Sequence, residues 1–282
     1  MIRLLTLHIF IAVLATTGVT RTALSEDIVV LLSINTVGNT ELLSAARSEC
    51  GMDSARYINL AEIDEFNLQQ LLYSTRAKAV LAIGDKAYRL ASSNAQKVPV
   101  IGAMTTDRNF NTISYMPPPE KYLAAMRKLG RKSVAVIYSR KTASYVRKAA
   151  ELSGGYGVTL ISGESSSPTE AMDLFMSLIK QADALWMLPD SNILTTGSAE
   201  LLLRSAQDRK IPVFAFSRKH LEKGAAVVIE PDRDRIGRIV GEAVCSTANN
   251  GSATLLKEDP YRESSNDLIF KQLGLTTPNL ED

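Results

Sequence analysis

One stretch of the sequence decides the fold: Ala184-Leu185-Trp186-Met187-Leu188-Pro189-Asp190-Ser191-Asn192. Its five leading apolar residues predict a strand that is buried on both faces, as in the middle of a parallel sheet. We expect Trp186, at the centre of this strand, to be structural. Asp190 follows the strand at its carboxyl end, where open α/β sheets bind ligands. We therefore expect Asp190 to bind a ligand and to contribute little to stability, the alternative being that it caps a turn.

The same pattern recurs from residue 27 onward, where short apolar runs alternate with amphipathic stretches of helical length. The expected strands are Ile28–Leu32, Arg56–Leu60, Ala79–Ile83, Pro99–Ala103, Ser133–Tyr138, Val158–Ser162, Ala184–Leu188, Pro212–Phe216 and Ala225–Ile229. The expected helices are Glu41–Cys50, Ile63–Thr75, Lys86–Ser92, Glu120–Leu129, Ala199–Asp208 and one that begins after Ser167. This alternation predicts an α/β protein with parallel sheets.

Three consecutive prolines interrupt the pattern at Met116-Pro117-Pro118-Pro119. They cannot continue a helix or a central strand, so we expect a linker between two similar lobes with a cleft between them. Polar residues follow the predicted strands at Ser33–Asn35, Gly84-Asp85, Thr105–Asp107, Tyr138-Ser139, Pro189–Asn192 and Ser217. Such residues suit a small polar ligand, although the same residue types also form turns and helix caps.

The first 25 residues have the pattern of a secretory signal peptide. A positive start at Arg3 precedes the apolar run Leu4–Val19, and Ala23-Leu24-Ser25 resembles a cleavage site. We expect cleavage before Glu26 and a periplasmic or secreted protein, the alternative being an uncleaved anchor helix. Cleavage would lower the formal net charge from +2 to 0. A chain with no net charge lacks the excess of Lys and Arg that binds phosphate backbones, so we expect no nucleic-acid partner.

Histidine and cysteine are too few for most catalytic and metal sites. After cleavage His220 would be the only histidine, in a charged stretch where a surface position is expected. We therefore expect no metal, no cofactor and no catalytic residue. Cys50 and Cys245 either form a disulfide in an oxidising compartment or remain buried free thiols. The alternating charges of residues 232–235 are typical of the solvated first turn of a helix.

Five segments, in this order, carry a resemblance to a known family. They are residues 182–192, Lys210–Ser217, Lys223–Ala226, Ile236–Arg238, and Ser265-Asn266 with Lys271–Leu275. Together they resemble the substrate-binding proteins of ABC transporters with the class I periplasmic-binding-protein fold, in the branch that includes binders of aromatic amino acids. The likeness extends from about Val80 to the end of the chain. Gly84–Ala87 stands where that branch shows Thr-Pro-x-Ala, and Asp107-Arg108 replaces its Asp-Pro, so the ligand class does not carry over.

The resemblance implies two Rossmann-like lobes with parallel sheets, joined by a three-segment hinge. Lobe one would comprise residues 26–116 with 232–258, and lobe two residues 117–231 with 259–282. The hinge segments would lie near Met116–Pro119, at Glu230–Asp232 and before the final helix. The positions facing the cleft would be Gly84, Asp85, Thr106, Asp107, Tyr138, Ser144, Asp190, Asn192 and Ser217.

The implied function is that of a non-enzymatic solute-binding protein, expected to be a monomer. It would close on a small organic solute, for which an amino-acid-like molecule is one candidate, and deliver it to an ABC permease at the membrane. One alternative is a ligand-sensing partner of a receptor. Another is an α/β hydrolase or transferase, which would need a nucleophile and a base that converge in the cleft.

Overall fold

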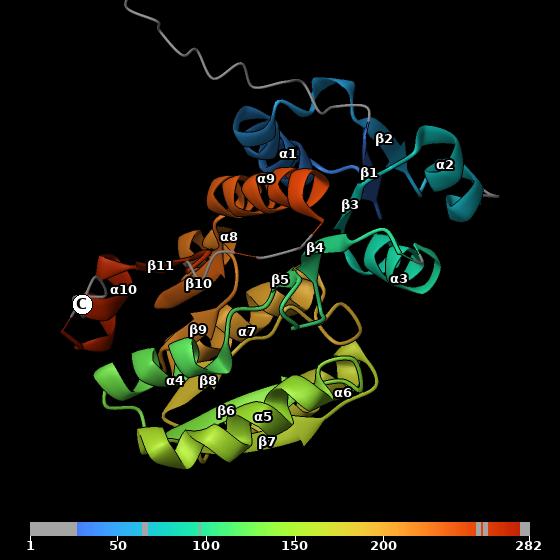
Figure 1. Cartoon of the computed structure of the whole chain (residues 1–282). Coiled ribbons are helices and arrows are strands. Elements are labelled where there is room, and N and C mark those ends of the chain that lie inside the picture. The colour runs from blue at the N-terminus through green and yellow to red at the C-terminus, as the bar shows by residue number, and fades with distance from the viewer. Residues whose placement is uncertain (1–26, 64–66, 96, 252–254, 256–258, 277–282) are drawn as a thin grey trace, which may run out of the picture.

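Two β-sheets, one above the other in Figure 1, organise the molecule. The structure is a computed structural model that describes residues 27–63, 67–95, 97–251, 255 and 259–276. The expected signal peptide, residues 1–25, lies outside the described residues. Within those ranges, we find no helix with both the length and the apolar character needed to cross a membrane.

The first sheet has the strand order β2-β1-β3-β4-β5, and all its strands are parallel. They are β1 (Ile28–Leu32), β2 (Arg56–Asn59), β3 (Ala79–Ile83), β4 (Val100–Thr105) and β5 (Thr112–Ser114). Helices α1 (Val37–Cys50) and α9 (Arg233–Asn250) cover one face, and α2 (Leu68–Thr75) and α3 (Asp85–Asn94) cover the other. Residues of β1 alternate between these two cores, so the strand is buried on both faces as its apolar sequence predicts.

The second sheet has the order β11-β10-β9-β8-β6-β7. Its strands are β6 (Ser133–Tyr138), β7 (Thr159–Glu164), β8 (Ala184–Trp186), β9 (Val213–Ala215), β10 (Val227–Pro231) and β11 (Tyr261–Ser265). All pairs are parallel except β10 with β11. Helices α4 (Pro119–Lys128), α5 (Ala143–Ser153) and α10 (Asp267–Leu273) share one core, and α6 (Pro168–Leu178) and α7 (Thr196–Asp208) share the other. The short helix α8 (Arg218–Glu222) follows β9.

The prediction that Trp186 is a core residue is confirmed. Its side chain is 1% exposed, and its ring lies 4.9 Å from that of Tyr122 and 5.6 Å from that of Tyr145, measured between ring centroids. These two tyrosines come from α4 and α5, the helices on that face of the sheet. Trp186 is therefore packed between the sheet and its helical cover.

The expected strands and helices are present, with ends that differ by four residues or fewer in all but one of them. The helix expected from Ile63 begins at Leu68, and residues 64–66 of the expected range lie outside the described residues. Strands β5 and β11 and helix α5 had no clear sequence pattern, and two short 3₁₀ helices occur at Met52–Ser54 and Gly154–Tyr156. Met116–Pro118 forms a connection between β5 and α4, and Pro119 is the first residue of α4, where proline is well tolerated.

Helices α1 and α9 lie side by side although they are far apart in the sequence (Figure 1). Gly241 touches Ala46 so closely that an added Cβ would lie 2.6 Å from the Ala46 carbonyl oxygen, and Gly237 meets the Leu42 carbonyl in the same way. Cys50 and Cys245, one turn further along each helix, form a disulfide with Cα atoms 5.6 Å apart. The contacts advance in the same direction on both helices, so the pair is parallel. Of the two alternatives for the cysteines, the structure has the disulfide.

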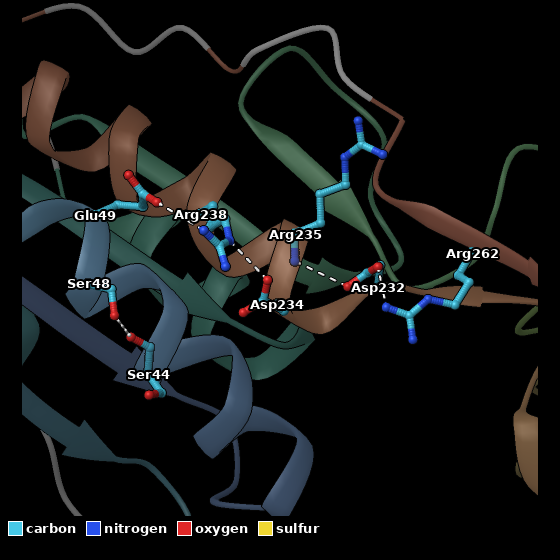
Figure 2. Close-up of polar contacts among 8 residues, drawn as sticks. All are labelled: Ser44, Ser48, Glu49, Asp232, Asp234, Arg235, Arg238 and Arg262. Carbon is cyan, nitrogen blue, oxygen red and sulfur yellow. Dashed lines mark hydrogen bonds and ion pairs between the residues drawn. The ribbon is translucent and has the colours of Figure 1, made fainter.

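The start of α9 joins the two sheets. Asp232 accepts hydrogen bonds from the Arg235 backbone N–H (3.2 Å) and from the Arg262 guanidinium (2.6 Å), which belongs to β11 (Figure 2). Arg238 pairs with Asp234 at 2.9 Å and reaches Glu49 of α1 at 3.7 Å. The prediction of a solvated, charge-matched first turn is confirmed. The lobe boundaries given above stay a prediction.

Candidate functional site

Each sheet has a point where the strand order reverses. The order 2-1-3-4-5 of the first sheet recurs in the second as β7-β6-β8-β9-β10. At such a point the connections leave neighbouring strands in opposite directions and open a crevice beyond their carboxyl ends. In the first sheet this crevice lies beyond β1 and β3, where Ser33 and Asp85 are found. In the second sheet it lies beyond β6 and β8, where Ser139 and Asp190 are found. The topology thus locates the candidate site.

The first sheet brings Gly84, Asp85 and Thr106 together. Gly84 has φ +88° and lies so close to Ser33 that an added Cβ would be 2.7 Å from the Ser33 Oγ, so only glycine fits there. Asp85 Oδ1 accepts hydrogen bonds from the backbone N–H (2.6 Å) and the hydroxyl (2.8 Å) of Thr106. These contacts join the first turn of α3 to the end of β4. Asp107 is exposed, and its carbonyl accepts the Thr105 hydroxyl at 3.0 Å.

Asp190 is the most tightly held of the predicted residues. Its side chain is 1% exposed, and its carboxylate accepts hydrogen bonds from the Ser139 N–H (2.9 Å), the Thr142 hydroxyl (2.5 Å) and the Asn192 N–H (3.1 Å). Burial by itself would raise the pKa of Asp190, but these hydrogen bonds outweigh it and hold the pKa below its usual value. The contacts disagree with the expectation that Asp190 contributes little to stability, because it fastens the loop after β6 to the loop after β8.

Asn192 lies beside this carboxylate. Its side-chain amide donates to the Ser139 hydroxyl at 3.2 Å. Both Asp190 and Asn192 therefore connect the loop after β8 to the loop after β6. A hollow of about 480 Å³ opens next to them at the carboxyl edge of β6 and β7. It is lined by Ser139, Arg140, Glu164, Ser165, Ser166, Glu170 and Asn192.

The remaining predicted residues are more dispersed. Tyr138 ends β6 and is half-buried against the core under α4 and α5, and Ser144 is exposed in the first turn of α5. Ser217 follows β9, half-buried at the start of α8. His220, expected on the surface, is instead half-buried, with its ring centroid 4.6 Å from that of Phe216. Burial and the nearby charge of Lys223 lower the pKa of His220.

Tyr115 is a further residue that the sequence pattern does not single out. It lies in the connection between β5 and α4, and its N–H donates to the Thr105 carbonyl at 3.0 Å. Its ring packs against the core of the second sheet, and its hydroxyl oxygen is buried with no hydrogen-bond partner among the described residues. Burial, followed by the charges of Asp85 and Asp190, raises the pKa of Tyr115 to about 12. Tyr115 therefore contacts the end of β4 through its backbone and the core of the second sheet through its ring.

By sequence, neither a protein-family model nor a curated protein matches this chain. A substrate-binding protein with adhesive properties from Clostridium difficile, in its ligand-free, open form, has a TM-score of 0.71 and 19% identity, covering 89% of this chain and 96% of its own. The ABC domain in complex with L-Trp from Streptococcus pneumonia has a TM-score of 0.64 and 17% identity, covering 89% and 95%.

A third solved structure, the periplasmic ribose ABC transporter from Conexibacter woesei, has a TM-score of 0.59 and 12% identity. It covers 88% of this chain and 94% of its own. At these identities the likeness concerns the fold. The expected class I periplasmic-binding-protein fold, with two α/β lobes, is confirmed. The same fold is shared with a LacI family transcriptional regulator from Bifidobacterium animalis, at a TM-score of 0.60 and 12% identity.

Proposed function

We propose that this protein is an extracytoplasmic solute-binding protein that closes on a small organic solute and delivers it to an ABC permease, without catalysing a reaction. The main support is that Tyr115, in the connection between the sheets, contacts both of them: its N–H donates to the Thr105 carbonyl at the end of β4, and its ring packs against the core of the second sheet. Thr105 precedes Thr106, which binds Asp85 at the first crevice. Export after cleavage before Glu26, and a monomeric state, belong to the same proposal.

The proposed ligand-binding residues are those expected from the sequence: Gly84, Asp85, Thr106, Asp107, Tyr138, Ser144, Asp190, Asn192 and Ser217. A solute that contacts both lobes stabilises the closed arrangement by its greater affinity for it. Two of the similar structures are an ABC domain bound to L-Trp and a ribose ABC transporter, and both of these solutes are small and polar. We propose a solute of this size for the present chain and favour an amino-acid-like one.

Solute binding is tested first by native mass spectrometry of the exported protein, purified without unfolding, to identify any carried molecule. The unfolding midpoint is then measured with each of the twenty amino acids and with D-ribose. Binding to the folded state alone raises the midpoint in proportion to RT ln(1 + [L]/Kd). If no molecule is carried and none of these solutes raises the midpoint, solute binding is refuted.

Two carboxylate variants make this test specific. Asp85→Asn removes the charge of a residue at the crevice and should weaken binding about five- to tenfold. Asp173→Asn makes the same change on the exposed surface of α6 and should leave binding unchanged. Equal affinity in both variants would argue against a site at the first crevice.

Delivery to a permease requires a separate experiment in cells. Uptake of the identified solute, supplied radiolabelled, should fall when the gene is deleted and recover when the wild-type gene is returned. Normal uptake in the deletion strain would instead favour a sensory role for the same binding protein.

A further inference from the structure

The hydroxyl of Tyr115 is a buried polar group that forms no hydrogen bond with the described residues of either sheet. Among the described residues it has no hydrogen-bond partner, whereas the hydroxyls of Tyr57, Tyr145 and Tyr261 each donate to a backbone carbonyl at 2.9 Å. Most buried hydroxyls in native proteins are paired, because an unpaired one has lost its hydrogen bonds to water without replacement. The position of Tyr115 therefore requires an explanation.

The contacts of Tyr115 divide between the two sheets. Its backbone is bound to Thr105 at the end of β4, next to Thr106, which holds Asp85. Its ring packs against the core of the second sheet, formed by α4, α5 and Trp186. The connection continues to Pro117, whose carbonyl accepts the Tyr145 hydroxyl of α5. Tyr115 thus belongs to one lobe by its backbone and to the other by its ring.

We propose that Tyr115 is a ligand-binding residue, whose hydroxyl oxygen accepts a hydrogen bond from the solute enclosed between the lobes. This inference rests on the proposed solute-binding function and adds a contact from the connection itself. Opening of the lobes would expose the hydroxyl, the solute would pair with it, and closure would bury the pair. A solute that reaches this oxygen contacts a side chain shared by both lobes, so binding would favour closure.

The surroundings indicate which group of the solute meets the oxygen. The phenol is neutral at physiological pH, as an ordinary tyrosine is, and burial with the nearby carboxylates raises its pKa further, to about 12. The carboxylates that contribute to this shift, Asp85 and Asp190, also make the region negative. A hydrogen-bond donor, such as a protonated amine or a hydroxyl group, therefore suits the site, and a carboxylate does not.

The test is Tyr115→Phe, which removes the hydroxyl and keeps the ring. Removing an unpaired buried hydroxyl should leave the unfolding midpoint unchanged or raise it. Affinity for the amino acid or sugar that binds the wild-type chain should fall about five- to tenfold, as for the loss of one hydrogen bond. Calorimetry with the twenty amino acids and D-ribose, on the full exported chain, measures this change.

The matched control is Tyr57→Phe on β2. The Tyr57 hydroxyl donates to the Met52 carbonyl (2.9 Å) and accepts from Arg47 (2.8 Å), so this variant should lose stability and keep its affinity. Equal affinity in wild type and Tyr115→Phe overturns the role of Tyr115 and leaves solute binding intact. A lowered midpoint in Tyr115→Phe also overturns it, because the hydroxyl would then be structurally paired. If neither an amino acid nor D-ribose binds the wild-type chain, the proposed solute binding is refuted, and the proposed role of Tyr115 is refuted with it.

Discussion

Asp190 lies near the end of the stretch that predicts the fold, and its carboxylate accepts hydrogen bonds from the loops of its own sheet. It accepts two backbone N–H groups and one hydroxyl from the loops after β6 and β8. The sequence correctly places it at the carboxyl edge, but it does not reveal that these donors converge on it. Position along a strand is a local property, whereas hydrogen-bond saturation depends on residues about fifty positions away, such as Ser139.

Replacing Asp190 should therefore destabilise the protein. In Asp190→Ala the donors of Ser139 and Thr142 lose a buried, charged acceptor, and we expect the free energy of unfolding to fall by about 3 kcal/mol. Urea denaturation followed by Trp186 fluorescence measures this loss. Asp173→Ala, on the exposed surface of α6, should change it by less than about 0.5 kcal/mol. If Asp190→Ala lowers the free energy of unfolding by as little as Asp173→Ala does, the hydrogen bonds of Asp190 contribute little to stability.

The same carboxylate predicts a pH dependence with a definite sign. Its pKa in the folded state lies below the ordinary value of 3.8. Stabilisation by such a group is complete above the unfolded pKa and is lost as the pH falls through the folded pKa. The stability difference between wild type and Asp190→Asn should be constant from about pH 5 to pH 7 and shrink below about pH 4. A difference that grows on acidification would contradict the direction of the shift.

At the scale of elements, buried strands are predictable and edge elements are not. Strand β1 consists entirely of buried apolar residues, and its sequence alone indicates its place. Strand β11, Tyr-Arg-Glu-Ser-Ser, pairs antiparallel at the sheet edge and lacks that pattern. Strand β5 has only three residues. Tyr115 was missed for a related reason, since an unpaired hydroxyl arises from packing and has no counterpart in a sequence pattern.

The close contact of α1 with α9 depends on glycine at Gly237 and Gly241. A methyl group at either position would meet a backbone carbonyl of α1, which cannot move aside as a side chain can. We expect Gly237→Ala to lower the free energy of unfolding by about 2 kcal/mol. Gly154→Ala is the control, because its added Cβ would meet nothing within 4 Å and its φ of −58° suits alanine. Equal stability of the two variants would disprove the close packing.

The disulfide fastens the same two helices. Cys50 and Cys245 are separated by 195 residues, so the bond closes a long loop in the unfolded chain. Its loss in Cys50→Ser with Cys245→Ser should lower the free energy of unfolding by about 2–4 kcal/mol. The wild-type chain should approach the variant when a reductant is present. Two titratable thiols in unfolded, unreduced protein would show that the bond does not form.

At the scale of the whole molecule, the connections between the sheets are bound to one another. Tyr261 of β11 donates to the Ser114 carbonyl of β5 at 2.9 Å, and the Asp232 N–H donates to the Pro260 carbonyl at 2.9 Å. Arg108, before β5, donates to the carbonyls of Met116 and Pro117. A relative motion of the two lobes would act on these connections, which are tied together by the contacts above.

Arg108 is the residue through which that motion can be tested. Its guanidinium lies 5.5 Å from the centroid of the Tyr145 ring of α5, whose hydroxyl donates to the same Pro117 carbonyl that Arg108 contacts. Arg108→Ala removes this cation–π contact and the hydrogen bonds to the connection. We expect this loss to lower the free energy of unfolding by about 2 kcal/mol. We expect a lower unfolding midpoint and, in small-angle X-ray scattering, a larger radius of gyration because the lobes separate more freely.

Two further variants give this prediction its controls. Arg108→Lys keeps the charge but loses the planar fork of the guanidinium, so it should restore only part of the wild-type behaviour. Arg147→Ala removes an exposed arginine from α5 and should leave both measurements unchanged. Trp186 provides an independent readout, because its ring contacts Tyr145: its emission should shift in Arg108→Ala, shift less in Arg108→Lys and stay unchanged in Arg147→Ala. If the radius of gyration and the emission both match wild type, Arg108 does not restrain the lobes, and the connection is held by its tyrosines and prolines.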